Sequence, residues 1–286
     1  MKFINYNELN NKLIKEEIFS QLYLEGYIGI KNVPNFLNHY KEYLNSARSF
    51  MALSSDIREK STPKNYYERG WSYGVERLDG KPDIHKGSYY AQFPDNSTNI
   101  WPNEEFRNNY LQLANTIFNV SRELIDILYP DLKDKIILPT GRMLYYGPVN
   151  DIIENNDAWC TLHRDHSLIT GLCPAAYFKD GEYIPNAEIN DPKGGLFIRG
   201  KRIVVPEDIL LFQVGEALQL LTNGKITATL HEVKKVSGGL ERYTFALFTN
   251  PEDSLIMSST DNSYSDRFKS GMSYGDWSQA SLKKYL

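Results

Sequence analysis

The spacing of hydrophobic residues divides the chain near residue 136. In segments 6–26 and 103–132, apolar residues recur at intervals of three and four. This interval matches the turn of an α-helix and collects apolar side chains on one face, which predicts two amphipathic helices. The first 135 residues are therefore expected to be mainly helical.

After residue 136 the pattern changes to short apolar runs separated by Gly, Pro, Asn and Asp. Runs of this length between turn-forming residues are typical of β-strands. The last part of the chain is more polar and is expected to end in a short helix. The strand segments expected from the pattern are 136–147, 194–200, 201–206, 208–215, 226–236 and 241–250.

These patterns predict a single domain over residues 1–286. A chain of 286 residues is long enough to bury a sizeable core. No internal repeat, low-complexity tract or flexible linker interrupts the sequence. We expect a mainly helical part over 1–135, a β-rich core over 136–250, and a C-terminal segment with a short helix over 251–286.

Composition and charge narrow the range of partners. The formal net charge is −4 and the 32 Lys and Arg residues are scattered, which argues against the basic surface that a nucleic acid requires. The N-terminus has no signal-peptide pattern and no segment has the apolar length of a membrane span, so we expect a cytoplasmic protein without a membrane partner. The two cysteines, Cys160 and Cys173, are expected to be reduced, packed thiols.

The stretch TLHRDHSLIT, residues 161–170, places four polar residues inside an otherwise strand-like run. Side chains of a strand alternate between its faces, so His163 and Asp165 are expected on one side, and Arg164 and His166 on the other. An imidazole and a carboxylate on one face are two of the three ligands in the facial triad that binds non-haem Fe(II). The alternative is a surface histidine beside an unrelated aspartate.

A third ligand is available in segment 226–236, which contains His231. Gly238–Gly239 predicts a two-residue hairpin turn, because both positions of a type I′ turn need positive φ. Counting outward from this turn places His231 opposite Ala246. Directly opposed residues share a face of a sheet. The face of His231 is therefore expected to carry Arg242, Thr244 and Phe248.

Arg242 would then lie about four residues along the strands from His231, or roughly 13 Å. An imidazole, a metal ion, a five-carbon diacid and an arginine side chain together span such a gap. An inward-facing arginine beside Thr244 requires an anion. A solvated strand arginine is the alternative.

Several segments carry a family resemblance through their order and spacing. YIGIKNVPNF and NIWPNEEFRNNYLQL precede GRMLYYGP, LHRDHSLITGL, GGLFIRG and ERYTFALFTNP. Together they resemble the Fe(II)- and 2-oxoglutarate-dependent dioxygenases of the isopenicillin N synthase-like family, over nearly the whole chain. This resemblance implies a mixed, mainly β fold: a distorted double-stranded β-helix, or jelly roll, buttressed by N-terminal helices.

The resemblance also implies roles for individual residues. The iron ligands would be His163, Asp165 and His231. The 2-oxoglutarate-binding residues would be Arg242, Thr244 and Tyr146. Thr244 replaces the usual serine but keeps the hydroxyl, whereas Leu144 stands where some members have a cosubstrate-binding asparagine, and Gly147 separates Tyr146 from Pro148.

The implied activity is an oxidation, with hydroxylation as the expected outcome, of a small-molecule metabolite in secondary metabolism. It would use Fe(II), 2-oxoglutarate and O₂ and yield succinate and carbon dioxide. The substrate is expected to be polar, and the enzyme a monomer or weak homodimer. Candidate substrate contacts are Arg69, Tyr89 and Phe248. Asp165 occupies the position where halogenating members have a small residue, which disfavours halogenation.

Two other functions fit the same motifs. In the first, the chain is an Fe(II) oxidase of this fold that performs cyclisation or desaturation without 2-oxoglutarate. In the second, it is a non-catalytic β-barrel binding protein. Formation of succinate from 2-oxoglutarate distinguishes the dioxygenase from both.

Overall fold

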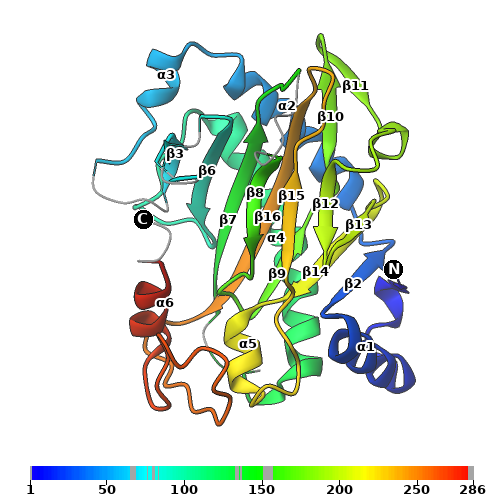
Figure 1. Ribbon diagram of the computed structural model, residues 1–286, viewed down its shortest axis with the longest axis vertical. Helices are drawn as coiled ribbons and strands as arrows, with labels where there is room; N and C mark the ends of the chain where they lie inside the picture. Colours follow the sequence, from blue (N-terminus) through cyan, green and yellow to red (C-terminus); the bar gives the residue numbers. More distant parts are fainter. Residues whose placement is uncertain are drawn as a thin grey trace.

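The computed structural model describes residues 2–64, 69–75, 77–78, 81–82, 84–132, 135, 137–150 and 157–282. Figure 1 shows a body built around β-strands, with helices behind the strands, at the upper left and at the lower end. Among these residues, no helix combines the length and the apolar character that a membrane span requires.

The main sheet has ten strands and is the larger of the two sheets that form the β-core. Its order is β1-β2-β14-β9-β16-β7-β6-β3, and β10 and β11 are attached through β16. The pairs are antiparallel except for β1 with β2. The strands are β1 (Phe3–Asn5), β2 (Tyr27–Lys31), β3 (Gly70–Tyr73), β6 (Lys86–Gln92), β7 (Ile137–Tyr146), β9 (Ile169–Leu172), β10 (Ala176–Lys179), β11 (Glu182–Ile184), β14 (Ile209–Val214) and β16 (Glu241–Pro251).

A four-stranded sheet in the order β13-β12-β15-β8 lies against the main sheet. Apolar residues from both sheets form one buried cluster, which includes Leu144 and Ala246 of the main sheet and Leu196 and Val233 of the smaller one. Two sheets packed in this way form the expected double-stranded β-helix. The smaller sheet contains β8 (Ala158–His163), β12 (Gly195–Ile198), β13 (Lys201–Ile203) and β15 (His231–Lys234), and a separate pair joins β4 (Arg77–Leu78) to β5 (Lys81–Pro82).

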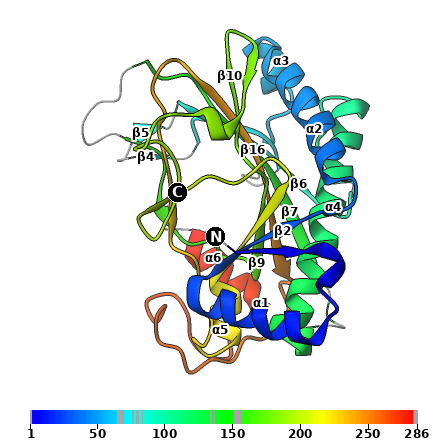
Figure 2. The same cartoon turned by 90° about the vertical axis from the view of Figure 1, so that its right-hand side faces the viewer.

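Helices cover the opposite face of the main sheet. Figure 2 shows α2 and α4 side by side along the sheet. In the core between them, the ring of Phe245 lies 5.0 Å from that of Tyr43 and 4.8 Å from that of Tyr110, centroid to centroid, both edge-on. The helices are α1 (Lys12–Glu25), α2 (Phe36–Met51), α3 (Ser55–Glu59), α4 (Glu104–Leu128), α5 (Glu216–Leu221) and α6 (Tyr274–Leu282), with 3-10 turns η1 (Tyr6–Glu8), η2 (Pro130–Leu132) and η3 (Asn186–Glu188).

The helices approach the sheet so closely that two strand positions require glycine. A Cβ atom on Gly171 would lie 2.2 Å from a side-chain carbon of Ile117, and one on Gly141 would lie 2.6 Å from the Tyr110 hydroxyl. Real Cβ atoms do not approach other atoms this closely, so these glycines allow α4 to pack on β7 and β9.

The observed helices and strands can be compared with the predicted segments one by one. The segments predicted as helices contain α1 and α4, and the tail ends in α6. The first 135 residues are richer in helix than in strand, but β1, β2, β3 and β6 join the main sheet. The strand predicted over 226–236 is shorter and forms only as β15, His231–Lys234.

The predicted hairpin between His231 and Ala246 is wrong. Both turn glycines have positive φ, 89° at Gly238 and 72° at Gly239. However, β15 pairs with β12 and β8, while β16 pairs with β7, β9 and β10. The turn therefore carries the chain from one sheet to the other, which is how a jelly roll closes. Local turn geometry reveals that the chain reverses, but not which strands it pairs.

Candidate active site

Three potential metal ligands meet between the two sheets. His163 ends β8, and β15 begins with His231, its direct pairing partner. Asp165 follows two residues after the end of β8, and its Oδ1 lies 3.6 Å from Nε2 of His163 and 3.8 Å from Nε2 of His231. The ligand atoms of the three residues all lie within 4.8 Å of one another. Two imidazoles and one carboxylate in this arrangement match the facial triad of non-haem iron sites.

Hydrogen bonds orient both imidazoles toward the centre of this group. Nδ1 of His163 lies 2.7 Å from the carbonyl oxygen of Thr161, and Nδ1 of His231 lies 3.0 Å from that of Thr229. A ring N–H that donates to a carbonyl places the proton on Nδ1 and leaves the lone pair on Nε2. The Nε2 atoms are the ones that face Asp165, so they are the atoms available to a metal ion.

The charge states of His231 and Asp165 suit a cation, whereas His163 must lose a proton to bind one, because Cys160 and Asp165 outweigh burial and hold its pKa well above the usual range. Burial, reinforced by the charge of His163, lowers the pKa of His231 to about 4, so this ring is neutral at neutral pH. Burial opposes ionisation of Asp165, but the two histidines, together with hydrogen bonds from His163 and Thr170, hold the pKa of its carboxyl well below the usual range. A neutral imidazole and an ionised carboxylate are the forms that bind metals.

The loop that carries Asp165 is anchored by a buried ion pair. The backbone N–H of Glu216, the first residue of α5, donates to the carbonyl oxygen of Asp165 at 2.8 Å. The Glu216 carboxylate in turn accepts two hydrogen bonds from Nη2 of Arg267, both 2.8 Å long. Sequence reasoning missed this pair, because Arg267 lies outside helices and strands and no periodicity marks it.

His166 lies apart from the three potential ligands. Its Nε2 is 3.9 Å from Oε2 of Glu216, and its ring packs edge-on against Trp277 with 5.6 Å between centroids. The sequence placed His166 on the far side of a continuing strand. His166 does lie away from the potential ligands, but not because a strand continues through it. Strand β8 ends at His163, and a bend turns His166 away.

A cavity lies beside the triad and is lined from both sheets. Its walls include all three potential ligands, and the remaining lining residues are Arg142, Leu144, Tyr146, Cys160, Thr170, Leu172, Leu196, Gln213, Val233, Arg242, Thr244, Ala246 and Phe248. His231 therefore shares this cavity with Arg242, Thr244 and Phe248, but the predicted common sheet face is wrong, because β15 and β16 belong to different sheets.

Arg242 is a buried cation with unused hydrogen-bonding capacity. Its side chain lies over the Tyr146 ring, 5.1 Å from the centroid. Within the described part of the chain, Nε and Nη1 of this buried guanidinium have no hydrogen-bond partner. Leaving buried charged donors unpaired is costly. The site is therefore built for an anion.

The neighbours of Arg242 add two hydroxyl groups. Thr244 Oγ1 donates to the carbonyl oxygen of Cys173 at 2.8 Å. Tyr146 pairs directly with Arg242 across β7 and β16. Burial raises the pKa of Tyr146 to about 12, so its hydroxyl keeps its proton at neutral pH.

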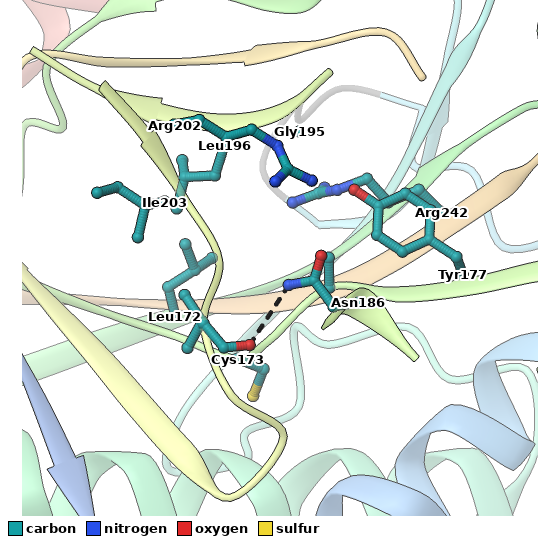
Figure 3. Close-up of a pocket in the computed structure, with 11 residues that line it drawn as sticks. Leu172, Cys173, Tyr177, Asn186, Gly195, Leu196, Arg202, Ile203 and Arg242 are labelled. Carbon is teal, nitrogen blue, oxygen red and sulfur yellow. Dashed lines mark hydrogen bonds between the residues drawn. The ribbon is translucent and has the colours of Figure 1, made fainter. Parts of the chain in front are cut away.

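A smaller cavity lies on another side of Arg242 (Figure 3). Arg242 and Leu172 line both cavities, and Tyr177, Asn186 and Arg202 line the smaller one. In this cavity Asn186 Nδ2 donates to the carbonyl oxygen of Val205 at 3.3 Å. The guanidinium of Arg242 thus forms part of the wall between the two spaces.

The three substrate candidates from the sequence fall in different places. Phe248 lines the larger cavity, whereas Arg69 lines neither of the two described. Tyr89 was wrong as a substrate contact: it is fully buried in the helix-side core, and its hydroxyl donates to the carbonyl oxygen of Ile100. Strand alternation explains the error, because Tyr89 pairs with Met143, on the face of β7 that packs against helices.

The two cysteines form no disulfide, as expected. Cys173 is buried in the helix-side core. Cys160 lines the larger cavity, where its Sγ lies 3.8 Å from Nδ1 of His163.

Comparison with known proteins agrees with this geometry. Residues 142–251, which include all three potential ligands and Arg242, match the 2OG-Fe(II) oxygenase superfamily. The matched segment runs from within β7 to the end of β16 and so contains the strands that carry the site. The protein is a 2-oxoglutarate-dependent dioxygenase whose cofactor is Fe(II) and whose cosubstrates are 2-oxoglutarate and O₂.

Solved structures share the fold of this oxygenase over nearly all of its length. A full-length Neurospora crassa protein in complex with alpha-KG and thymine is 18% identical, with a TM-score of 0.75 and coverage of 99% of this chain and 97% of that one. A 2OG-Fe(II) oxygenase family protein from Caulobacter crescentus is also 18% identical, with a TM-score of 0.74 and coverage of 100% and 99%. A UPF0676 protein from Schizosaccharomyces pombe is 23% identical over 273 residues, 89% of this chain and 83% of the relative.

Proposed function

We propose that this oxygenase hydroxylates a small, polar metabolite in the cavity between its two sheets. His163, Asp165 and His231 bind the iron, and residues 1–286 act as one oxygenase domain. The observation that supports this most strongly is the presence, in one cavity, of the converging triad and a buried arginine with unpaired donors.

In this proposal Arg242 binds the distal carboxylate of 2-oxoglutarate. A guanidinium offers a planar fork that matches a carboxylate, and its Nε and Nη1 donors need partners. Tyr146 and Thr244 lie beside it as further hydroxyl groups. The Thr244 hydroxyl donates to Cys173 in this structure, so it must turn from that carbonyl to donate to a carboxylate.

Fe(II), 2-oxoglutarate and O₂ together supply the oxidant for a C–H bond, with succinate and carbon dioxide as products. The protein orients the reactants and excludes water. Apolar residues such as Leu144, Val233 and Phe248 line the space beside the triad, which protects a reactive centre from solvent. Asp165 provides the third protein ligand of the iron. The coordination position that a halide would need in its place is therefore occupied. Hydroxylation is therefore favoured over halogenation.

The ligands in similar solved structures support a small-molecule substrate. One similar structure contains thymine and another, JOX2, contains JA. Both of these ligands are small, and the cavity here is enclosed by two sheets.

The test is the turnover of 2-oxoglutarate by iron-loaded enzyme, followed as succinate released. We expect succinate from the native enzyme and a product sixteen mass units heavier than its substrate, with the new oxygen derived from ¹⁸O₂. Oxygen uptake that does not depend on 2-oxoglutarate would instead identify an oxidase of the same fold. The absence of both activities, in protein that holds iron, would support a binding protein.

A further inference from the structure

The end of the cavity remote from Arg242 contains a second arginine that the sequence analysis did not single out. Arg142 lines the cavity from β7. It pairs with Ala246, whereas Tyr146 pairs with Arg242, so the two arginines are four residues apart along the ladder. This separation is roughly 13 Å at the usual rise per residue. The cavity thus has a cationic group toward each end.

Arg142 is held in a fixed orientation. The hydroxyl of Ser88 on β6 accepts from its Nε at 3.0 Å and from its Nη2 at 2.8 Å. The guanidinium also lies over the ring of Tyr90, 4.9 Å from the centroid. A guanidinium fixed in this way presents its plane at a defined angle, which favours recognition of a planar anion.

Lys86 adds a cation on β6 at the end of the sheet that carries Arg242, four residues along the ladder from Arg142. It pairs with Tyr146 across β6 and β7, so its side chain is on the cavity face of the sheet, and only 9% of the residue is exposed. Burial raises the pKa of Tyr146, and the charges of Arg242, Lys86 and Arg142 all act on that hydroxyl in the opposite direction. All three cations therefore lie within electrostatic reach of the cavity.

The cavity that Arg142 shares with the triad has partly apolar walls. Leu144, Leu196, Val233 and Phe248 line it, together with the polar residues Thr170 and Gln213. A ligand that fits both features has an apolar body and one anionic group. The five-carbon cosubstrate lacks such a body, and Arg242 already provides an anion site on the other side.

We propose that the substrate is an organic carboxylate with an apolar body, and that its carboxylate binds Arg142. This inference rests on the proposed function, because it assigns the remaining part of the same cavity. A carboxylate held at Arg142 directs the apolar body toward His163, Asp165 and His231. The carbon that is oxidised then belongs to the body and is distant from the carboxylate.

The experiment compares acids with their uncharged amides of the same shape. Phenylacetate and phenylacetamide form one probe pair, and octanoate and octanamide form another. Binding to the enzyme loaded with Fe(II) and 2-oxoglutarate is measured calorimetrically without oxygen. We expect at least one acid to bind about 10-fold or more tightly than its amide, as a charge-assisted hydrogen bond implies. Equal binding of acid and amide in both pairs would overturn the proposal.

Two variants then assign the preference to Arg142. In Arg142→Gln the acid should lose its advantage, whereas Arg142→Lys should retain part of it. If Arg142→Gln does not fold, Ser88→Ala serves in its place, because it removes the acceptor that orients the guanidinium and should reduce the preference. An acid preference that survives in the folded Gln variant would contradict the proposal.

A separate measurement distinguishes this proposal from the assignment of the cosubstrate. The affinity for 2-oxoglutarate should fall in Arg242→Gln and be retained in Arg142→Gln. The reverse result would make Arg142 the cosubstrate anchor and overturn the substrate assignment. Failure of the native enzyme to bind 2-oxoglutarate at all would instead contradict the proposed function.

Discussion

The two faces of the main sheet come from the same strands but differ in chemistry. On β16, Tyr243, Phe245 and Leu247 enter the core that packs against helices. The residues that alternate with them, Arg242, Thr244 and Ala246, line the cavity. One face thus consists of aromatic and aliphatic side chains, and the other includes buried polar groups. A period of two residues is enough to separate structural from functional positions along one strand.

The two faces also differ in their effect on the stability of the fold. The helix-side face buries rings in edge-on contacts, which stabilise the fold. The cavity face retains Arg242 with unpaired donors, an arrangement that costs stability until an anion binds. Substitutions on the helix-side face should therefore mainly lower stability. Substitutions on the cavity face should mainly lower activity.

The strongest test of the cavity face is removal of a metal ligand. His163→Ala, Asp165→Ala and His231→Ala should each lose bound iron and lower activity by more than about 100-fold, a loss beyond that typical of residues around the ligands. His166→Ala is the matched control and should retain most iron, because its ring packs on Trp277. Iron content by elemental analysis and succinate formation measure the effect. Comparable iron loss in His166→Ala would show that the ligands are misassigned.

The helix-side face should respond in stability. Phe245→Ala removes a fully buried ring that contacts Tyr43 and Tyr110, and should lower the free energy of unfolding by about 3–5 kcal/mol. Phe248→Ala, three residues later on the cavity face, should cost less stability because that residue is only half-buried. Urea unfolding of the two variants makes the comparison. Equal losses of stability would mean that the two faces do not differ in this way.

The sequence predicted the residues that share the site better than the pairing that brings them together. The H-x-D spacing of His163 and Asp165 and the resemblance to a family identified the triad. Both are signals that short sequence motifs contain. The position of His231 opposite Ala246 was wrong, because jelly-roll closure pairs strands distant in sequence and no local pattern encodes it. Tyr89 was misplaced for a related reason: its face depends on the register of β6 against β7.

Other parts of the site had no sequence signal at all. Arg142 reads as an ordinary strand arginine, and only its neighbours Ser88 and Tyr90 on another strand show that it is fixed beside the cavity. Glu216 and Arg267 are 51 residues apart, and their contact depends on how the C-terminal segment folds back over α5. Contacts of this kind follow from tertiary packing and not from periodicity.

The next test concerns the shape of the cation on the cavity face. Arg242→Lys keeps the charge but replaces a planar fork with an ammonium, so the affinity for 2-oxoglutarate should fall by about 10-fold or more. Iron content should be unchanged, since Arg242 is not among the potential ligands. The KM for 2-oxoglutarate measures the loss. An unchanged KM would mean that another residue binds the distal carboxylate.

The smallest effect is expected at Thr244, where the two faces come closest in character. This residue is 1% exposed and its hydroxyl donates to the carbonyl oxygen of Cys173 at 2.8 Å, so it contributes to stability even though it lines the cavity. Thr244→Val keeps the shape but removes the donor, and should lower the free energy of unfolding by about 1 kcal/mol and raise the KM for 2-oxoglutarate. Thr244→Ser retains the hydroxyl and should leave the KM nearly unchanged, with any loss of stability due to the missing methyl group. Urea unfolding and succinate kinetics on both variants separate the two contributions. If Thr244→Val loses stability but keeps the native KM, the hydroxyl serves the sheet alone and Arg242 and Tyr146 hold the carboxylate without it.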